Sequence, residues 1–159
     1  MTISTGDKIP SVTLRHMTPD GPAEIATQDI FTGKKVVLFA VPGAFTPGCS
    51  MSHLPGFVDH VDQIKAKGVD TVACIAVNDA FVMHAWGEAH KAEGIQMLAD
   101  PDGEFARAVG LAVDLSQFGL GMRSARYALV VDDGVVTSAH IEPEGGITVS
   151  AASAVLEHL

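Results

Sequence analysis

Residues 35–50 read KVVLFAVPGAFTPGCS, an apolar run followed by a short boundary rich in glycine and proline. The run at 35–41 has the length and composition of a strand buried on both faces. Helical spacing begins beyond the boundary, at residue 51. Thr46 is a favourable N-cap residue, and Pro47 suits the first helical position, where its missing N–H would be unpaired anyway. The stretch therefore predicts a strand, a loop and a helix start.

Cys49 falls in the first turn of that predicted helix. Backbone N–H groups are unpaired there and the helix dipole is positive, so a thiolate is favoured. Such positions lower the pKa of cysteine from about 8.5 to roughly 3.5–7.5. The neighbouring Gly48 and Ser50 are small and do not resemble core residues. The sequence predicts a reactive nucleophile at Cys49, with a buried small hydrophobic residue as the alternative.

The composition indicates one globular domain spanning residues 1–159. The chain has 159 residues, of which 47% are hydrophobic and 18% charged, enough to build a single core. Its net charge is −9 and no basic cluster is longer than Lys34-Lys35, which argues against nucleic acid or an anionic membrane as a partner. Residues 1–7 lack the features of a signal peptide, and the run at 36–42 is too short to span a bilayer. We expect a cytoplasmic protein whose two cysteines stay reduced.

The segment before the central run predicts a hairpin. Alternating polarity predicts a strand at 11–16, and a turn at 18–22 leads to a short second strand at 23–26. A brief helical turn follows at 27–31, for which Thr27 is the expected cap. These elements precede the buried strand that leads to Cys49.

Beyond residue 50 helical and strand patterns alternate. The predicted segments are a helix from 51 to 68, a strand at 69–77, a helix at 80–91, a strand at 95–99, a helix at 103–109, unassigned residues 111–122, strands at 127–131 and 135–141, and a helix at 150–158. Pro55 predicts a kink or break near residues 53–54. Asn78 or Asp79 can cap the second helix. Residues 132–134, Asp-Asp-Gly, predict a hairpin turn.

This order of elements predicts an α/β fold with a central mixed β-sheet flanked by helices. It is compatible with a thioredoxin-like fold, in which the reactive thiol would follow a central strand at a helix start.

Pro42, Thr46 and Cys49 stand in a P-x-x-x-T-x-x-C arrangement, the signature of peroxiredoxins. Together with residues 53–57, His-Leu-Pro-Gly-Phe, the stretch 41–50 resembles the peroxiredoxin 5 subfamily, which includes the plant type II enzymes. The resemblance continues through residues 72–74, 77–81, Trp86, 98–101 and 126–127. It therefore covers nearly the whole chain.

The resemblance implies a thiol peroxidase that reduces hydrogen peroxide and organic hydroperoxides without a cofactor. Cys49 would attack the terminal peroxide oxygen and become a sulfenic acid. Thr46 would join the hydrogen-bond network of thiolate and peroxide, and Pro42 would shield the sulfur from water. Arg126 matches the family's arginine from a later strand, where a planar fork of donors can stabilise developing negative charge.

Other site residues follow from the same resemblance. Arg123 is a second choice for the arginine, because it lies in a less regular stretch. Phe45, Gly48 and His53 are expected to contact the substrate, with His53 beside the opening of the site. Without the resemblance, Arg126 would be interpreted as a solvated residue at a hairpin, since surface arginine is common.

The chain departs from the family members that resolve the sulfenic acid internally. Those members carry a second cysteine in the segment matching residues 145–150, and none is present here. Cys74 is the other thiol, and its apolar strand predicts a buried structural residue. We therefore expect a one-cysteine mechanism with an external thiol reductant, either glutathione with glutaredoxin or thioredoxin. The resemblance also implies a homodimer.

Three other functions compete with this one. Cys49, His53 and His60 could suggest zinc ligands, but Pro55 interrupts their helix face and no fourth ligand is evident, so no metal site is expected. A disulfide oxidoreductase would need Cys-x-x-Cys, but Ser52 stands where the second cysteine of that motif would be. Monothiol redox sensing without peroxidase turnover stays open. A binding module of the same fold is the remaining alternative, favoured only if Cys49 is unreactive.

Overall fold

A computed structural model of the chain describes residues 2–48, 52–143 and 146–159. Its strands are β1 (Thr13–Thr18), β2 (Gly21–Ala26), β3 (Lys35–Ala40), β4 (Thr71–Ala76), β5 (Ile95–Ala99), β6 (Ala112–Asp114), β7 (Met122–Ser124), β8 (Tyr127–Asp132) and β9 (Val135–Ile141). Its helices are α1 (Thr27–Phe31), α2 (Leu54–Ala66), α3 (Ala80–Ala89), α4 (Glu104–Ala108) and α5 (Ala152–Leu156), with a 3₁₀ turn, η2, at Ser116–Phe118. None of these helices is long and apolar enough to cross a membrane.

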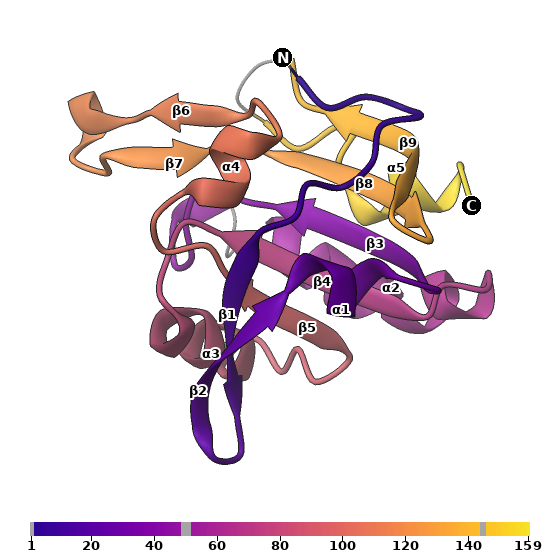
Figure 1. Ribbon diagram of the computed structural model, residues 1–159, viewed down its shortest axis with the longest axis horizontal. Helices are drawn as coiled ribbons and strands as arrows, with labels where there is room; N and C mark the ends of the chain where they lie inside the picture. The colour runs from indigo at the N-terminus through magenta and orange to yellow at the C-terminus, as the bar shows by residue number, and fades with distance from the viewer. Residues whose placement is uncertain (1, 49–51, 144–145) are drawn as a thin grey trace.

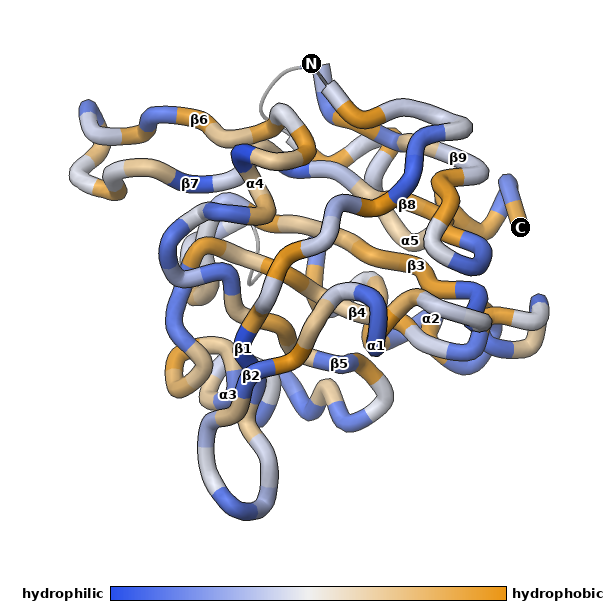
Figure 2. The backbone as a smooth tube through the Cα atoms, in the orientation of Figure 1, coloured by the Kyte–Doolittle hydropathy of each residue, from blue (hydrophilic) through white to orange (hydrophobic). Residues whose placement is uncertain are grey.

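Within the described residues, seven strands form one mixed sheet in the order β2-β1-β5-β4-β3-β8-β9 (Figure 1). The strands β3, β4 and β5 are parallel, and β8 pairs antiparallel with β3. The predicted hairpins are both present, β1 with β2 and β8 with β9. Figure 2 shows that the central strands are the most hydrophobic part of the backbone, as expected for strands covered on both faces.

Each face of the sheet is covered by a different set of helices. Along β3, Phe39 and its alternate neighbours pack on one face against α2, α3 and α5. Leu38 and its alternate neighbours pack on the other face against α1 and α4. The predicted mixed sheet with flanking helices is therefore confirmed, and β3 lies in its interior.

The register of the sheet brings a distant segment to the end of β3. Ala40, the last residue of β3, pairs with Tyr127, the first residue of the antiparallel strand β8. Arg126 directly precedes Tyr127, so it lies at the same end of β3. A residue far along the chain thus reaches the loop that follows β3.

The helix predicted over residues 51–68 is interrupted near its start, as Pro55 predicts. Ser52 and His53 form a π-helical turn, and the regular helix α2 begins at Leu54. Pro55 lies in the first turn of α2, where a proline needs no N–H partner. The predicted break near 53–54 is confirmed, and residue 51 lies outside the described residues.

Two local predictions about caps had different outcomes. Asp79 caps α3, because its Oδ1 accepts a hydrogen bond from Val82 N at 2.8 Å. Thr27 does not cap α1, because it is the first helical residue and its hydroxyl donates to Pro10 O at 2.8 Å. The hydroxyl also accepts from Val12 N, so Thr27 ties α1 to the segment before β1.

Residues 111–122, unassigned from the sequence, belong to an arm that projects from the main sheet (Figure 1). The strands β6 and β7 pair antiparallel with each other and are joined through η2. Gly119 and Gly121 both have positive φ angles, 75° and 69°, which glycine adopts without steric cost. The arm leads into β8 and so carries the chain toward Arg126.

Candidate active site

The loop after β3 is closed by Thr46. Its hydroxyl donates to Gly43 O at 2.7 Å, and its backbone N–H donates to the same carbonyl at 3.4 Å. Pro47 and Gly48 are helical, so Pro47 begins the helix as predicted. Asn78, just after β4, accepts a hydrogen bond from Ala44 N at 3.0 Å. The loop is therefore held both by its own threonine and by the neighbouring strand.

Phe45 lies at the tip of this loop. Its φ angle is +62°, in the left-handed region that aromatic residues seldom adopt. Its side chain is 55% exposed. An aromatic surface on this loop is compatible with the predicted substrate contact, which stays a prediction.

Arg126 lies against the first turn of the helix. Its Nη1 is 2.8 Å from His53 Nδ1. A Cβ atom added at Gly48 would lie 3.2 Å from its Nη2. The guanidinium therefore occupies the space that a side chain at residue 48 would fill. Gly48 immediately precedes Cys49 in the sequence.

Arg123, the second choice for the family arginine, reaches the same loop from β7. Its Nη1 donates to Pro42 O at 3.4 Å, and its Nε donates to Leu120 O at 2.9 Å. A Cβ atom at Gly43 would lie 2.7 Å from the Nη1 atom. Both arginines therefore converge on the loop: Arg123 contacts its beginning, and Arg126 contacts its end.

His53 is buried behind Arg126, with an exposed fraction of 1%. Its Nε2 is 3.0 Å from Ser150 O, a carbonyl that can only accept, so Nε2 carries the proton and Nδ1 accepts from Arg126. Burial lowers the pKa of His53 to about 4, the Arg126 charge acts in the same direction, and the Ser150 bond and Glu142 oppose it. His53 is therefore neutral at physiological pH.

The surroundings of His53 bear on its predicted role. Its ring packs against Phe39 and Phe57, with centroid distances of 5.2 and 5.6 Å. With both ring nitrogens engaged and almost no exposed surface, His53 offers no free atom to a substrate. This geometry argues against the predicted direct contact and instead places His53 as a support for Arg126.

The predicted nucleophile, Cys49, lies outside the described residues. The second thiol, Cys74, lies on β4 opposite Phe39 and has an exposed fraction of 0%. Its predicted burial is confirmed. A thiol at the centre of a sheet has no route to a peroxide in solution.

The histidines of the possible metal site are used elsewhere. His53 bonds Ser150 and Arg126, and His60 Nδ1 lies 2.7 Å from Gly56 O. Across the described ranges, no group of three His, Cys, Asp or Glu side chains is arranged to hold a metal ion.

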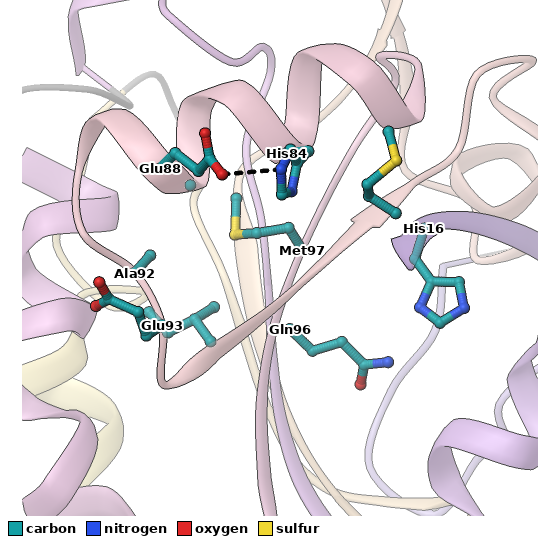
Figure 3. A pocket seen from close by; sticks show the side chains of 10 residues that line it. His16, His84, Glu88, Ala92, Glu93, Gln96 and Met97 are labelled. Carbon is teal, nitrogen blue, oxygen red and sulfur yellow. Dashed lines mark ion pairs between the residues drawn. The ribbon is translucent and has the colours of Figure 1, made fainter. Parts of the chain in front are cut away.

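A cavity of about 430 Å³ lies at a different place, between α3, β5 and β1 (Figure 3). Its lining includes His16, His84, Glu88, Glu93 and Met97. His84 and Glu88 form an ion pair of 3.0 Å in which both side chains are about half exposed or more. The cavity reaches Ile95, at the start of β5, whereas the loop follows the end of the parallel strand β3. It is therefore separate from the arginine site.

Comparison with known proteins identifies the family of the chain. The redoxin family matches residues 4–156. The chain is 49% identical to peroxiredoxin-2E-2, chloroplastic, of Oryza sativa subsp. japonica, over 99% of this chain and 73% of that protein. It is 51% identical to reduced Prx3 from Vibrio vulnificus in complex with hydrogen peroxide, with a TM-score of 0.96 and 99% of both chains covered. It is 40% identical to peroxiredoxin 5 from Alvinella pompejana, with a TM-score of 0.86, covering 98% of this chain and 96% of that one. The chain has the thioredoxin-like fold predicted above and belongs to the redoxin family as a peroxiredoxin, a thiol-dependent peroxidase.

Proposed function

We propose that this chain is a one-cysteine peroxiredoxin of the peroxiredoxin 5 subfamily, which reduces hydrogen peroxide and organic hydroperoxides through Cys49. The observation that carries the proposal is the position of Arg126, held by His53 and packed on Gly48, the residue before Cys49. The likeness to peroxiredoxin 5 from Alvinella pompejana and to Prx3 bound to hydrogen peroxide supports the subfamily and the substrate.

The proposed reaction begins with the Cys49 thiolate. Its sulfur attacks the terminal oxygen of the peroxide, the O–O bond breaks, and the sulfur loses two electrons to give a sulfenic acid. The departing alkoxide or hydroxide takes a proton and leaves as alcohol or water. Arg126 stabilises the negative charge that develops on the departing oxygen. Thr46 orients the reacting groups, and Pro42 limits access of water to the sulfur.

The proposed one-cysteine cycle follows from the chain's two thiols. Cys74 is fully buried in β4, and residues 145–150 contain no cysteine. The sulfenic acid would therefore condense with an external thiol, releasing water and forming a mixed disulfide. A second thiol then releases Cys49 as thiolate. Glutathione with glutaredoxin, or thioredoxin, is the proposed reductant.

We also propose a cytoplasmic homodimer. Large apolar side chains are exposed on the loop and on the arm, at Phe45, Phe118 and Met122, with exposed fractions of 55%, 68% and 47%. Exposed apolar surface next to a site is typical of an interface. A reducing compartment would maintain both thiols and supply the reductant.

Stopped-flow oxidation by hydrogen peroxide tests the proposal. The wild-type protein and Cys74→Ser should react at similar rates, far faster than free cysteine, and Cys49→Ser should not react. Steady-state turnover with glutathione and glutaredoxin, run beside thioredoxin, then identifies the reductant. A wild-type thiol that reacts no faster than free cysteine would refute the peroxidase function, and a large loss of turnover in Cys74→Ser after normal oxidation would refute the one-cysteine cycle.

A further inference from the structure

A closed ring of hydrogen bonds begins and ends at Arg126. The backbone carbonyl of Arg126 accepts from Glu142 N at 3.2 Å, and the Glu142 carboxylate accepts from Ser150. The carbonyl of Ser150 is bonded to His53 Nε2, and His53 Nδ1 is bonded to the Arg126 guanidinium. We propose that Glu142 is a positioning residue for Arg126, acting through Ser150 and His53. This inference rests on the proposed function, in which Arg126 stabilises the departing oxygen.

The Glu142 carboxylate is the acceptor on which the ring depends. Its Oε2 accepts from Thr148 N at 2.8 Å, Ser150 N at 2.9 Å and Ser150 Oγ at 2.6 Å. Its Oε1 accepts from Thr148 Oγ1 at 2.6 Å. Burial alone would raise the pKa of Glu142, but these hydrogen bonds together lower it to about 2. The side chain is therefore an anion at every physiological pH and keeps all four donors.

Ser150 transmits the position of the carboxylate to His53. Its backbone N–H and its hydroxyl are both bonded to Glu142 Oε2, and the residue is completely buried. These two bonds hold the N–H and the side chain of Ser150 in place, and the carbonyl of the same residue, in the following peptide, faces His53 Nε2. Because a carbonyl is only an acceptor, it selects the tautomer with the proton on Nε2.

The tautomer of His53 decides how Arg126 is held. With the proton on Nε2, the Nδ1 lone pair accepts from Arg126 Nη1 at 2.8 Å. With the proton on Nδ1, two donors would face each other and the guanidinium would have to move away. A misplacement of about 1 Å can reduce a rate by about 100-fold. Glu142 therefore positions Arg126 in two ways. Its N–H bonds the Arg126 backbone carbonyl, and its carboxylate, through Ser150, orients His53, which holds the Arg126 side chain.

Two substitutions at Glu142 separate positioning from simple stabilisation. Glu142→Met keeps the length of the side chain but removes both acceptors. Glu142→Gln keeps one carbonyl oxygen, which can still accept from Ser150 while the Thr148 hydroxyl rotates to accept from the new amide. We expect Glu142→Met to slow peroxide oxidation of Cys49 by about tenfold to 100-fold, and Glu142→Gln to restore most of that loss.

The spectroscopic readout is the pair of ¹⁵N resonances of the His53 ring. In the wild-type protein these should show a protonated Nε2 and an unprotonated Nδ1, and in Glu142→Met they should move toward a mixture of the two tautomers. Asp70→Ala is the matched control, because Asp70 Oδ2 accepts from Lys35 N at 2.9 Å at the opposite end of β3. The control should lose stability without changing the His53 resonances or the oxidation rate.

Each outcome decides for or against the proposal. If the oxidation rates of Glu142→Met and Asp70→Ala agree within twofold, Glu142 only stabilises the fold and does not position Arg126. Slow oxidation with unchanged His53 resonances would also overturn it, since the effect would bypass His53. If Glu142→Met does not fold, Glu142→Asp replaces it, because its shorter side chain withdraws the acceptor from Ser150 while keeping the charge. The tautomer measurement needs no peroxide, so it tests the ring even if the wild-type thiol proves unreactive and the proposed function fails.

Discussion

The guanidinium of Arg126 packs on Gly48 so closely that a Cβ atom there would lie 3.2 Å from Nη2. Gly48 needs no unusual backbone angle, since it is helical. Its missing side chain is therefore explained by the arginine that occupies the space. The tight contact makes residue 48 a sensitive point at which to disturb the site without removing any functional group.

Gly48→Ala should slow the oxidation of Cys49 by a factor of about ten, because the added methyl displaces the guanidinium by a few tenths of an ångström or more. Gly56→Ala is the matched control, because Gly56 is helical in α2 and a Cβ there meets no atom within 4 Å. It should gain about 0.5–1 kcal/mol of stability and oxidise normally. Equal oxidation rates in the two variants, measured by stopped flow, would mean that the guanidinium tolerates the displacement.

Arg126→Lys should reduce the rate of peroxide oxidation by about 100-fold to 1,000-fold, comparable to removing one donor to a developing anion. Lysine retains the charge, but it lacks the planar fork with which Arg126 bonds His53 through Nη1 and packs on Gly48 through Nη2. Arg15→Lys, at the exposed ion pair with Glu24, should leave the rate unchanged. A rate for Arg126→Lys within threefold of wild type would show that charge alone is sufficient.

Thr46 is tested by comparing valine with serine at the same position. Thr46→Val removes the 2.7 Å bond to Gly43 O and should slow oxidation by about tenfold or more, because both loop closure and the hydroxyl are lost. Thr46→Ser keeps the hydroxyl and should stay within a few-fold of wild type. Should serine prove as slow as valine, the hydroxyl alone would be insufficient and the methyl group would be needed as well.

The unfolding free energy should depend on pH through His53. Its pKa is about 4 in the folded protein against 6.5 when unperturbed, so between these values the unfolded chain binds more protons. Stability should therefore fall by about 3 kcal/mol as the pH drops from 6.5 to 4. In His53→Gln this part of the slope should vanish. Urea denaturation of both proteins across this range measures the difference, to which His140 contributes nothing because it titrates in both.

The strand, the loop and the helix start around Cys49 were predictable because their signals are local. A buried apolar run, a threonine just before the helix and a proline at the first helical position act within a few residues. The hairpin of β8 and β9 was likewise predictable, since Asp-Gly favours the two-residue type I′ turn, which needs positive φ angles at both residues. Asp133 and Gly134 adopt φ angles of 48° and 79°.

What escaped prediction depends on contacts between distant segments. Thr27 looks like a cap, but Pro10 and Val12 engage its hydroxyl from outside the helix. The arm of β6 and β7 has strands of three residues each, too short for a period to show. The Glu142 contacts join the residue after β9 to Thr148 and Ser150, and the sequence carries no periodic signal for such contacts.

Arg123 and Arg126 converge on one loop and bring two cationic groups beside it in an acidic molecule. The chain carries a net charge of −9, so its long-range field repels anions. The two guanidiniums reach the loop from β7 and from the residue before β8. In solution at physiological ionic strength, the influence of such charges ends within about 8 Å. Neutral peroxides cross the acidic surroundings without penalty, whereas an anionic reductant is attracted only over the last few ångströms. Salt should therefore affect the reduction of the oxidised thiol much more than its oxidation.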